Sequence, residues 1–225
     1  MGSYLNPGNF SFRGSLRSKI YIDKSKLIAR TNEALCTEQK YICVSRPRRF
    51  GKSMAANMLA AYYDRSEHTN ELFENLKISK DQSYRENLNR YDVIKINIQE
   101  FLSMTGTVEE MLEMLKNYLI SDFKEAYPKI LLRDEKNLIQ VMKDVFSYTK
   151  CPFVILIDEW DCLFREYKQD KEEQKKYLDF LRAWLKDKDY VALAYMTGIL
   201  PIKKYGSHSA LNMFTEEEVK VLCKK

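Results

Sequence analysis

Four short hydrophobic runs in this chain have the length and composition of buried strands. They occupy residues 41–45, 92–99, 153–157 and 190–196. The third run is apolar at every position, which predicts a strand with both faces covered, as in the centre of a parallel sheet. The second run alternates polar and β-branched residues, so we expect a strand with one better-buried face, close to the edge of the sheet.

Apolar residues at helical spacing lie between these runs. The expected helices cover residues 26–34, 52–63, 107–127, 135–148 and 171–186. Thr107 and Glu110 form a Thr-x-x-Glu capping box at the start of one of them, and Pro128 ends it. The polar stretch 66–90 predicts a helix and loops beside the sheet.

This order of elements indicates an α/β fold, a three-layer sandwich with a mostly parallel central sheet and right-handed crossovers. Two strands and several helices separate Lys52 from Asp158, which suggests an inserted strand between the first strand and the wholly apolar strand. Near the end of the chain, Thr215 and Glu218 form a second capping box, so we expect a last helix there.

The segment between the first strand and the next helix reads Ser-Arg-Pro-Arg-Arg-Phe-Gly-Lys-Ser, residues 45–53. A strand that turns through Gly-Lys-Ser into a helix is the context of a phosphate-binding loop, because the helix start leaves backbone N–H groups free for an anion. Lys52 would reach the β- and γ-phosphates, and the Ser53 hydroxyl would bind Mg²⁺. The general pattern has Gly where Arg46 stands, so Arg46 must keep a negative φ or accept strain. The alternative is a strand-to-helix turn with an exposed lysine.

Two adjacent carboxylates follow the wholly apolar run. Asp158 and Glu159 would emerge at the carboxyl edge of the sheet, where α/β proteins bind ligands. Asp158 would hold Mg²⁺ and Glu159 would polarise the attacking water, unless both only start the next helix. Thr197 ends the neighbouring run and could hydrogen-bond the γ-phosphate or the water, or only shape the turn before Gly198.

Composition narrows the class of protein. The net charge is +5, which permits nucleic-acid contact without requiring it, and 45% hydrophobic with 31% charged residues is typical of a globular domain. No apolar run approaches the ~20 residues of a transmembrane helix, so no membrane contact is expected. The five cysteines contain no Cys-x-x-Cys pair, which favours free thiols and a cytoplasmic location.

The three arginines of the loop are open to two interpretations. Arg46, Arg48 and Arg49 could neutralise phosphate, act on a neighbouring subunit's nucleotide or follow a nucleic-acid backbone, or they could pair with local carboxylates. Asp23 and Lys24 precede the first expected helix, where an N-terminal Asp and a solvated lysine would be ordinary.

Four segments together resemble a known family. They are YIDKS (21–25), YICVSRPRRFGKSMAANML (41–59), VILIDEWD (154–161) and YMTGILPIKKYG (195–206). Over about residues 4–214 the chain is similar to the bacterial AAA-ATPase-like family of predicted ATPases, in which arginine is the usual residue at position 46. That family resembles P-loop NTPases of the additional-strand catalytic-glutamate class.

The resemblance implies a set of site residues. The nucleotide-binding residues would be Arg46, Pro47, Arg48, Arg49, Phe50, Gly51, Lys52, Ser53 and Met54. Ser53 and Asp158 would bind Mg²⁺, with ATP as the nucleotide, Glu159 as general base and Thr197 at the sensor position. Residues 1–225 would form one such domain, with a lead-in (1–40), a nucleotide-binding core (41–200) and a truncated lid or linker (201–225).

Family members usually continue into a domain similar to PD-(D/E)XK nucleases. We expect this chain to be the front part of a longer protein or a shortened relative, with a reduced lid. The leading hypothesis is an ATP-binding, slowly ATP-hydrolysing switch domain, possible partners being nucleic acid or a second copy of the chain. The alternative is a nucleotide-dependent module that binds nucleic acid or a protein without useful hydrolysis. Kinase activity ranks last, because an acid directly after Asp158 favours water activation.

Overall fold

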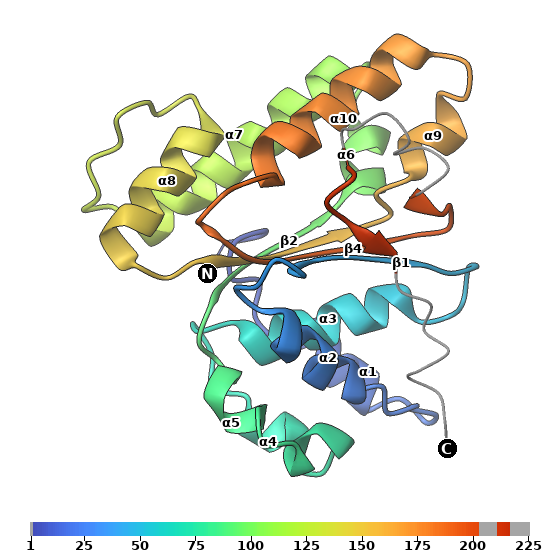
Figure 1. Cartoon of the computed structure of the whole chain (residues 1–225), viewed down its shortest axis with the longest axis vertical. Coiled ribbons are helices and arrows are strands. Elements are labelled where there is room, and N and C mark those ends of the chain that lie inside the picture. Colours follow the sequence, from blue (N-terminus) through green and yellow to red (C-terminus); the bar gives the residue numbers. More distant parts are fainter. Residues whose placement is uncertain (1, 203–210, 217–225) are drawn as a thin grey trace.

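A computed structural model describes residues 2–202 and 211–216 and has a five-stranded sheet at its centre (Figure 1). The strands are β1 (Tyr41–Ser45), β2 (Asp92–Asn97), β3 (Phe153–Asp158), β4 (Val191–Gly198) and β5 (Thr215–Glu216). Their spatial order is β2-β3-β4-β1-β5, and every neighbouring pair is parallel. The carboxyl ends of all five strands therefore lie at one edge of the sheet.

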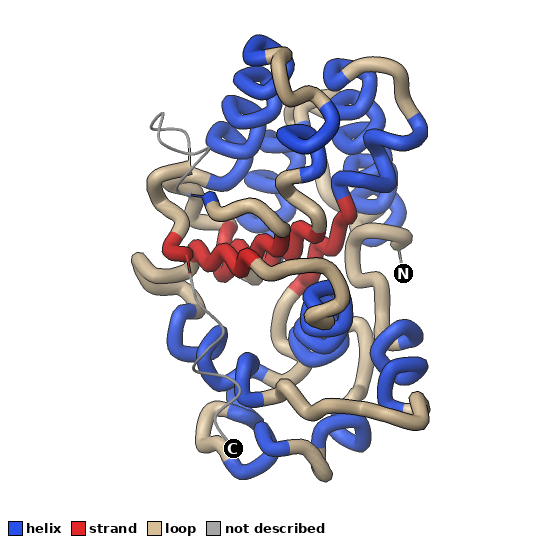
Figure 2. The backbone as a smooth tube through the Cα atoms, turned by 90° about the vertical axis from the view of Figure 1, so that its right-hand side faces the viewer, coloured by secondary structure: helices blue, strands red, loops and turns tan. Residues whose placement is uncertain are grey.

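Helices cover both faces of the sheet, which gives the three layers expected from the sequence (Figure 2). One face carries α1 (Phe10–Leu16), α2 (Lys26–Ala34), α3 (Lys52–Tyr63), α4 (Asn70–Phe73), the 3₁₀ helix η1 (Lys77–Lys80) and α5 (Tyr84–Asn87). The other carries α6 (Ile98–Met104), α7 (Val108–Ala126), α8 (Leu138–Thr149), α9 (Cys162–Glu166) and α10 (Lys171–Leu185). Each layer buries its own hydrophobic cluster against the sheet.

The helix bounds follow local signals in the sequence. Thr107 caps α7 and accepts the backbone N–H of Glu110, so the predicted capping box is confirmed. Asn137 caps α8 with two backbone bonds, and Asp170 caps α10. The expected bounds of α2, β1 and α3 agree with the structure at both ends.

The order of the strands confirms two predictions. The strand β4 lies between β1 and β3, where an inserted strand was expected. The alternating strand β2 lies at the edge, and residues 4–6 run along it with a backbone bond from Lys95 to Tyr4 and one from Asn6 to Val93. This short segment covers an edge that would otherwise offer unpaired backbone groups.

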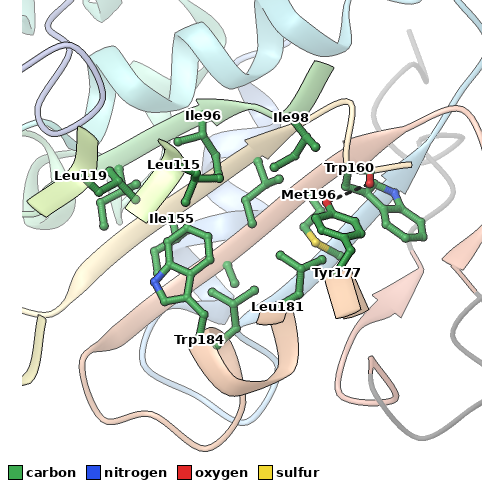
Figure 3. Close-up of a cluster of buried hydrophobic side chains, with 14 of the residues drawn as sticks. Ile96, Ile98, Leu115, Leu119, Ile155, Trp160, Tyr177, Leu181, Trp184 and Met196 are labelled. Carbon is green, nitrogen blue, oxygen red and sulfur yellow. Dashed lines mark hydrogen bonds between the residues drawn. The ribbon is translucent and has the colours of Figure 1, made fainter. Parts of the chain in front are cut away.

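Large side chains pack beneath the carboxyl ends of β3 and β4 (Figure 3). Trp160 and Tyr177 are fully buried, and the Tyr177 hydroxyl donates to the Trp160 carbonyl at 2.9 Å. Trp184 is also fully buried, further along the same face. Both tryptophans are packing groups, and Trp160 anchors the turn that follows the two adjacent carboxylates.

Three details of the sequence prediction need correction. The strand expected over residues 92–99 ends at Asn97, because the Asn97 side chain caps α6, which begins at Ile98. The helix expected from Thr215 is wrong at its start, because Thr215 and Glu216 form β5 and pair with Ile42 and Cys43. Its continuation, residues 217–225, lies outside the described residues. In addition, the lead-in contains the helix α1, for which the sequence pattern gave no prediction.

Candidate functional site

The segment 46–51 joins β1 to α3 at the carboxyl edge of the sheet. The Arg46 N–H donates to the Gly198 carbonyl at 2.9 Å, which continues the pairing of β1 with β4 beyond the strand. The Ser45 hydroxyl donates to the Leu200 carbonyl at 2.9 Å. The first residues of the loop are thus fixed to the segment that follows β4.

Lys52 begins α3 and turns back into the loop. Its Nζ donates to the carbonyls of Arg46 at 2.9 Å and Pro47 at 3.2 Å, and the residue is 8% exposed. The exposed-lysine alternative is therefore wrong. Gly51 is the N-cap with φ 72°, and no side chain caps the helix, so the first N–H groups of α3 remain available to an anion.

The three loop arginines do not behave alike. Arg46, which replaces the usual glycine, does not adopt a positive φ, whereas Arg49 does, at 69°. The strained backbone conformation that was considered for Arg46 therefore occurs at Arg49. Arg48 and Arg49 are exposed, and in the described part of the chain no carboxylate forms an ion pair with any of the three. Within the described residues, pairing with local carboxylates therefore does not explain the three arginines.

Asp158 ends β3 and is 4% exposed. One of its oxygens, Oδ1, accepts the backbone N–H of Glu159 at 3.0 Å and the Thr197 hydroxyl. Asp158 lines a cavity of about 410 Å³ together with Ser53 and Asn97. The hydroxyl and the carboxylate that were predicted to bind Mg²⁺, from positions more than a hundred residues apart, thus face one space.

Lys95 lines the same cavity, two residues before the end of β2. Burial lowers the pKa of its ammonium group, and the carboxylates of Asp158 and Glu100 oppose that shift. The sequence showed Lys95 only as the polar member of an alternating strand. Its place beside Asp158 follows from the pairing of β2 with β3, which the sequence alone did not reveal.

Glu159 turns away from this cavity. Its φ is 52°, and its carboxylate forms an ion pair with Arg165 of α9. Glu159 lines a second cavity, of about 930 Å³, with Arg48 of the loop and Lys168. The two adjacent acids therefore line different cavities, and Asn97 lines both.

Thr197 lies on β4, between the loop strand and the carboxylate strand, and is fully buried. Its hydroxyl donates to Asp158, while its carbonyl accepts the backbone N–H of Trp160 at 3.1 Å. Thr197 thus does more than shape the turn before Gly198. The contact that the structure describes is with the carboxylate that is predicted to bind the metal.

A comparison with protein families gives one finding. The model of a family described as a predicted AAA-ATPase matches residues 12–207. The chain belongs to the AAA-ATPase-like family. A comparison with curated proteins gave no match. Family and parallel α/β sheet together fit a nucleotide-binding domain.

Asp161 is an acid of this AAA-ATPase-like chain to which the sequence pattern gave no role. Asp161 is fully buried, and its Oδ2 accepts the backbone N–H groups of Ile199 at 3.0 Å and Leu200 at 2.8 Å. Arg165 approaches the same oxygen at 3.6 Å. The spacing Asp-Glu-Trp-Asp was visible in the sequence, but only the structure shows that its last acid holds the segment after β4.

A close approach explains the glycine at the end of β4 in this AAA-ATPase-like chain. A Cβ at Gly198 would lie 2.6 Å from the Trp160 indole nitrogen and 2.7 Å from Asp161 Oδ1. The two lysines at positions 203 and 204, which follow Thr197 in the sequence and could approach the phosphates, lie outside the described residues. Within residues 2–202 and 211–216, no helix has the length and apolar character of a membrane span.

Proposed function

We propose that this chain is an ATP-binding switch domain that hydrolyses ATP slowly. The observation that carries the proposal is the cavity shared by Ser53 and Asp158, at the start of α3 and the end of β3. A hydroxyl and a carboxylate are the oxygen ligands that Mg²⁺ takes in nucleotide sites. Ser53 also belongs to the first turn of α3, which Lys52 begins and which no side chain caps, so the cavity adjoins a helix start of the kind that binds phosphate.

Each residue has a defined role in this proposal. Lys52 and the loop 46–54 hold the phosphates, and Ser53 and Asp158 hold Mg²⁺, which when bound neutralises charge on the β- and γ-phosphates. Thr197 donates to Asp158 and fixes the orientation of that carboxylate. Glu159 orients the attacking water and accepts its proton.

The position of β4 between β1 and β3 supports the additional-strand catalytic-glutamate class, since Glu159 directly follows β3. We expect slow turnover because Arg165 holds the Glu159 carboxylate in an ion pair. We further propose that residues 1–225 form one domain, with its nucleotide-binding core at 41–200 and a lid or linker after it. The cycle would alter the segment after Thr197, which Asp161 attaches to the end of β3.

The test is phosphate release from ATP with Mg²⁺, measured beside nucleotide binding. Lys52→Ala should lose ATP binding, whereas Glu159→Gln should bind ATP and lose turnover. Glu166→Gln is the matched control, because Glu166 lines the same cavity as Glu159 but is exposed. If Glu159→Gln released phosphate as fast as the parent, the role of Glu159 as base would be wrong.

One observation favours a second candidate, a nucleotide-dependent binding module without useful hydrolysis. The ion pair with Arg165 occupies the group that would act as base, and the exposed Arg48 and Arg49 offer charge to nucleic acid or to a second copy of the chain. ATP binding by the parent chain, with no phosphate release above that of Glu159→Gln, would favour this candidate over the ATPase.

A further inference from the structure

The segment 21–25 runs beside the end of the phosphate loop. The Lys24 Nζ donates to the Phe50 carbonyl at 2.5 Å. The same nitrogen lies 3.0 Å from the point that a Cβ on Gly51 would occupy. A lysine of the lead-in thus bonds to Phe50 and lies near Gly51, the two residues that immediately precede α3, whose first N–H groups carry no side-chain cap.

The backbone on both sides of Lys24 is anchored. Asp23 accepts the Lys77 N–H at 2.9 Å, and the Ser25 hydroxyl accepts the Ile78 N–H at 3.1 Å. Asp23 also accepts the N–H of Ser25, at 2.8 Å. Both neighbours of Lys24 are therefore tied to η1, which holds the lysine beside the loop before any ligand arrives and lowers the entropic cost of using it.

Lys24 carries a positive charge without a carboxylate partner. Across residues 2–202 and 211–216 it takes part in no ion pair, and its ammonium is bonded to the neutral carbonyl of Phe50 although the side chain is partly buried. The adjacent carboxylate, on Asp23, is taken up by backbone N–H groups. A cation without a carboxylate partner beside an uncapped helix start favours an anion.

We propose that Lys24 is a second phosphate-binding lysine, which contacts a phosphate oxygen of the bound nucleotide. Lys52 bonds to carbonyls at the start of the loop and Lys24 to the carbonyl at its end, so the two ammonium groups approach the loop from its two ends. This inference rests on the proposed nucleotide binding and deepens it, because it assigns the segment 21–25 to the same site.

The experiment is calorimetric titration of ADP and ATP, with Mg²⁺, into the full chain and its variants. Lys24→Met removes both the charge and the N–H donor, Lys24→Gln keeps a donor for the Phe50 carbonyl, and Lys24→Arg keeps the charge. Lys26→Met is the matched control, because Lys26 is exposed two residues away. Lys52→Ala reports on nucleotide binding itself.

We expect Lys24→Met and Lys24→Gln to weaken ADP and ATP binding by about 10- to 100-fold, the loss of one charge-assisted bond. Lys24→Arg should stay within about threefold of the parent, as should Lys26→Met. If Lys24→Gln bound as tightly as the parent, the lysine would serve only to hold the Phe50 carbonyl, and the inference would be wrong.

Two further outcomes separate this inference from the proposed function. If Lys52→Ala abolished binding while Lys24→Met bound like the parent, the inference would fail and the proposed function would stand. If the parent itself bound neither nucleotide, both would fail.

Discussion

Arg165 forms an ion pair with Glu159 and also approaches Asp161, so one guanidinium group connects two acids of the Asp-Glu-Trp-Asp segment. The side chains of Arg165 and Glu159 are 19% and 23% exposed. The ion pair holds the Glu159 carboxylate at the cavity that it lines with Arg48, away from the cavity of Ser53 and Asp158, so Glu159 must turn from Arg165 to act on a water beside the proposed metal. The geometry makes Arg165 a restraint on the proposed base.

We expect Arg165→Gln to raise turnover by up to about fivefold with little change in ATP affinity, since a partly exposed pair contributes up to about 1 kcal/mol. Steady-state phosphate release and ATP titration are the measurements. Lys168→Gln is the control, because Lys168 lines the same cavity and is exposed. A fall of Arg165→Gln to the level of Glu159→Gln would contradict the restraint and make the arginine a requirement for turnover.

Thr197→Val tests the bond between β4 and the proposed metal ligand. The substitution keeps the shape of the side chain and removes the hydroxyl that donates to Asp158. The Mg²⁺ concentration for half-maximal turnover should rise by about tenfold, the usual effect of losing a group that orients a metal ligand. Thr197→Ser keeps the hydroxyl, so its Mg²⁺ concentration for half-maximal turnover should be close to that of the parent. Equal Mg²⁺ dependence in parent and Thr197→Val would show that the bond has no such role.

Asp161→Ala should destabilise the fold strongly. The substitution leaves the N–H groups of Ile199 and Leu200 without their acceptor, and we expect the free energy of unfolding to fall by about 2–4 kcal/mol. Urea unfolding is the measurement. Asp170→Ala is the matched control, because Asp170 also accepts a backbone N–H but is exposed, and its loss should cost about 1 kcal/mol. If both variants lost the same free energy of unfolding, the burial of Asp161 would make no extra contribution to stability.

The sequence predicted most of the fold because its signals are local. The uniform burial of β3, the alternation of β2 and the Thr107 capping box each depend on neighbouring residues, and each is present in the structure. Thr215 was misjudged because pairing with β1, a contact across the chain, overrode a helix-start pattern.

The candidate site residues that could be predicted are those that belong to a continuous sequence motif. Lys52 and Ser53 belong to a loop motif, and Asp158 stands at the end of an apolar strand. Lys95 lies at the site because β2 pairs with β3. Lys24 lies beside the loop because it bonds to Phe50, 26 residues further along the chain. No spacing in the sequence indicated either position.

Gly51→Ala tests the backbone of the phosphate loop. Gly51 has φ 72°, a conformation that costs a residue with a Cβ about 1–2 kcal/mol, and the new methyl group would approach Lys24 to 3.0 Å. We therefore expect the free energy of unfolding to fall by about 1 kcal/mol and ATP affinity to fall by about tenfold or more, because the methyl group intrudes where the loop turns into α3. Thermal unfolding and ATP titration are the measurements.

Gly14→Ala is the control for that substitution. Gly14 lies within α1, a Cβ there meets nothing within 4 Å, and alanine is the better helix former, so this variant should be as stable as the parent or more stable by up to about 1 kcal/mol. ATP affinity equal to that of the parent in both variants would show that the turn at Gly51 tolerates a side chain. The close approach of Lys24 would then have no bearing on the nucleotide, since a methyl group 3.0 Å from its ammonium nitrogen would have left ATP affinity unchanged.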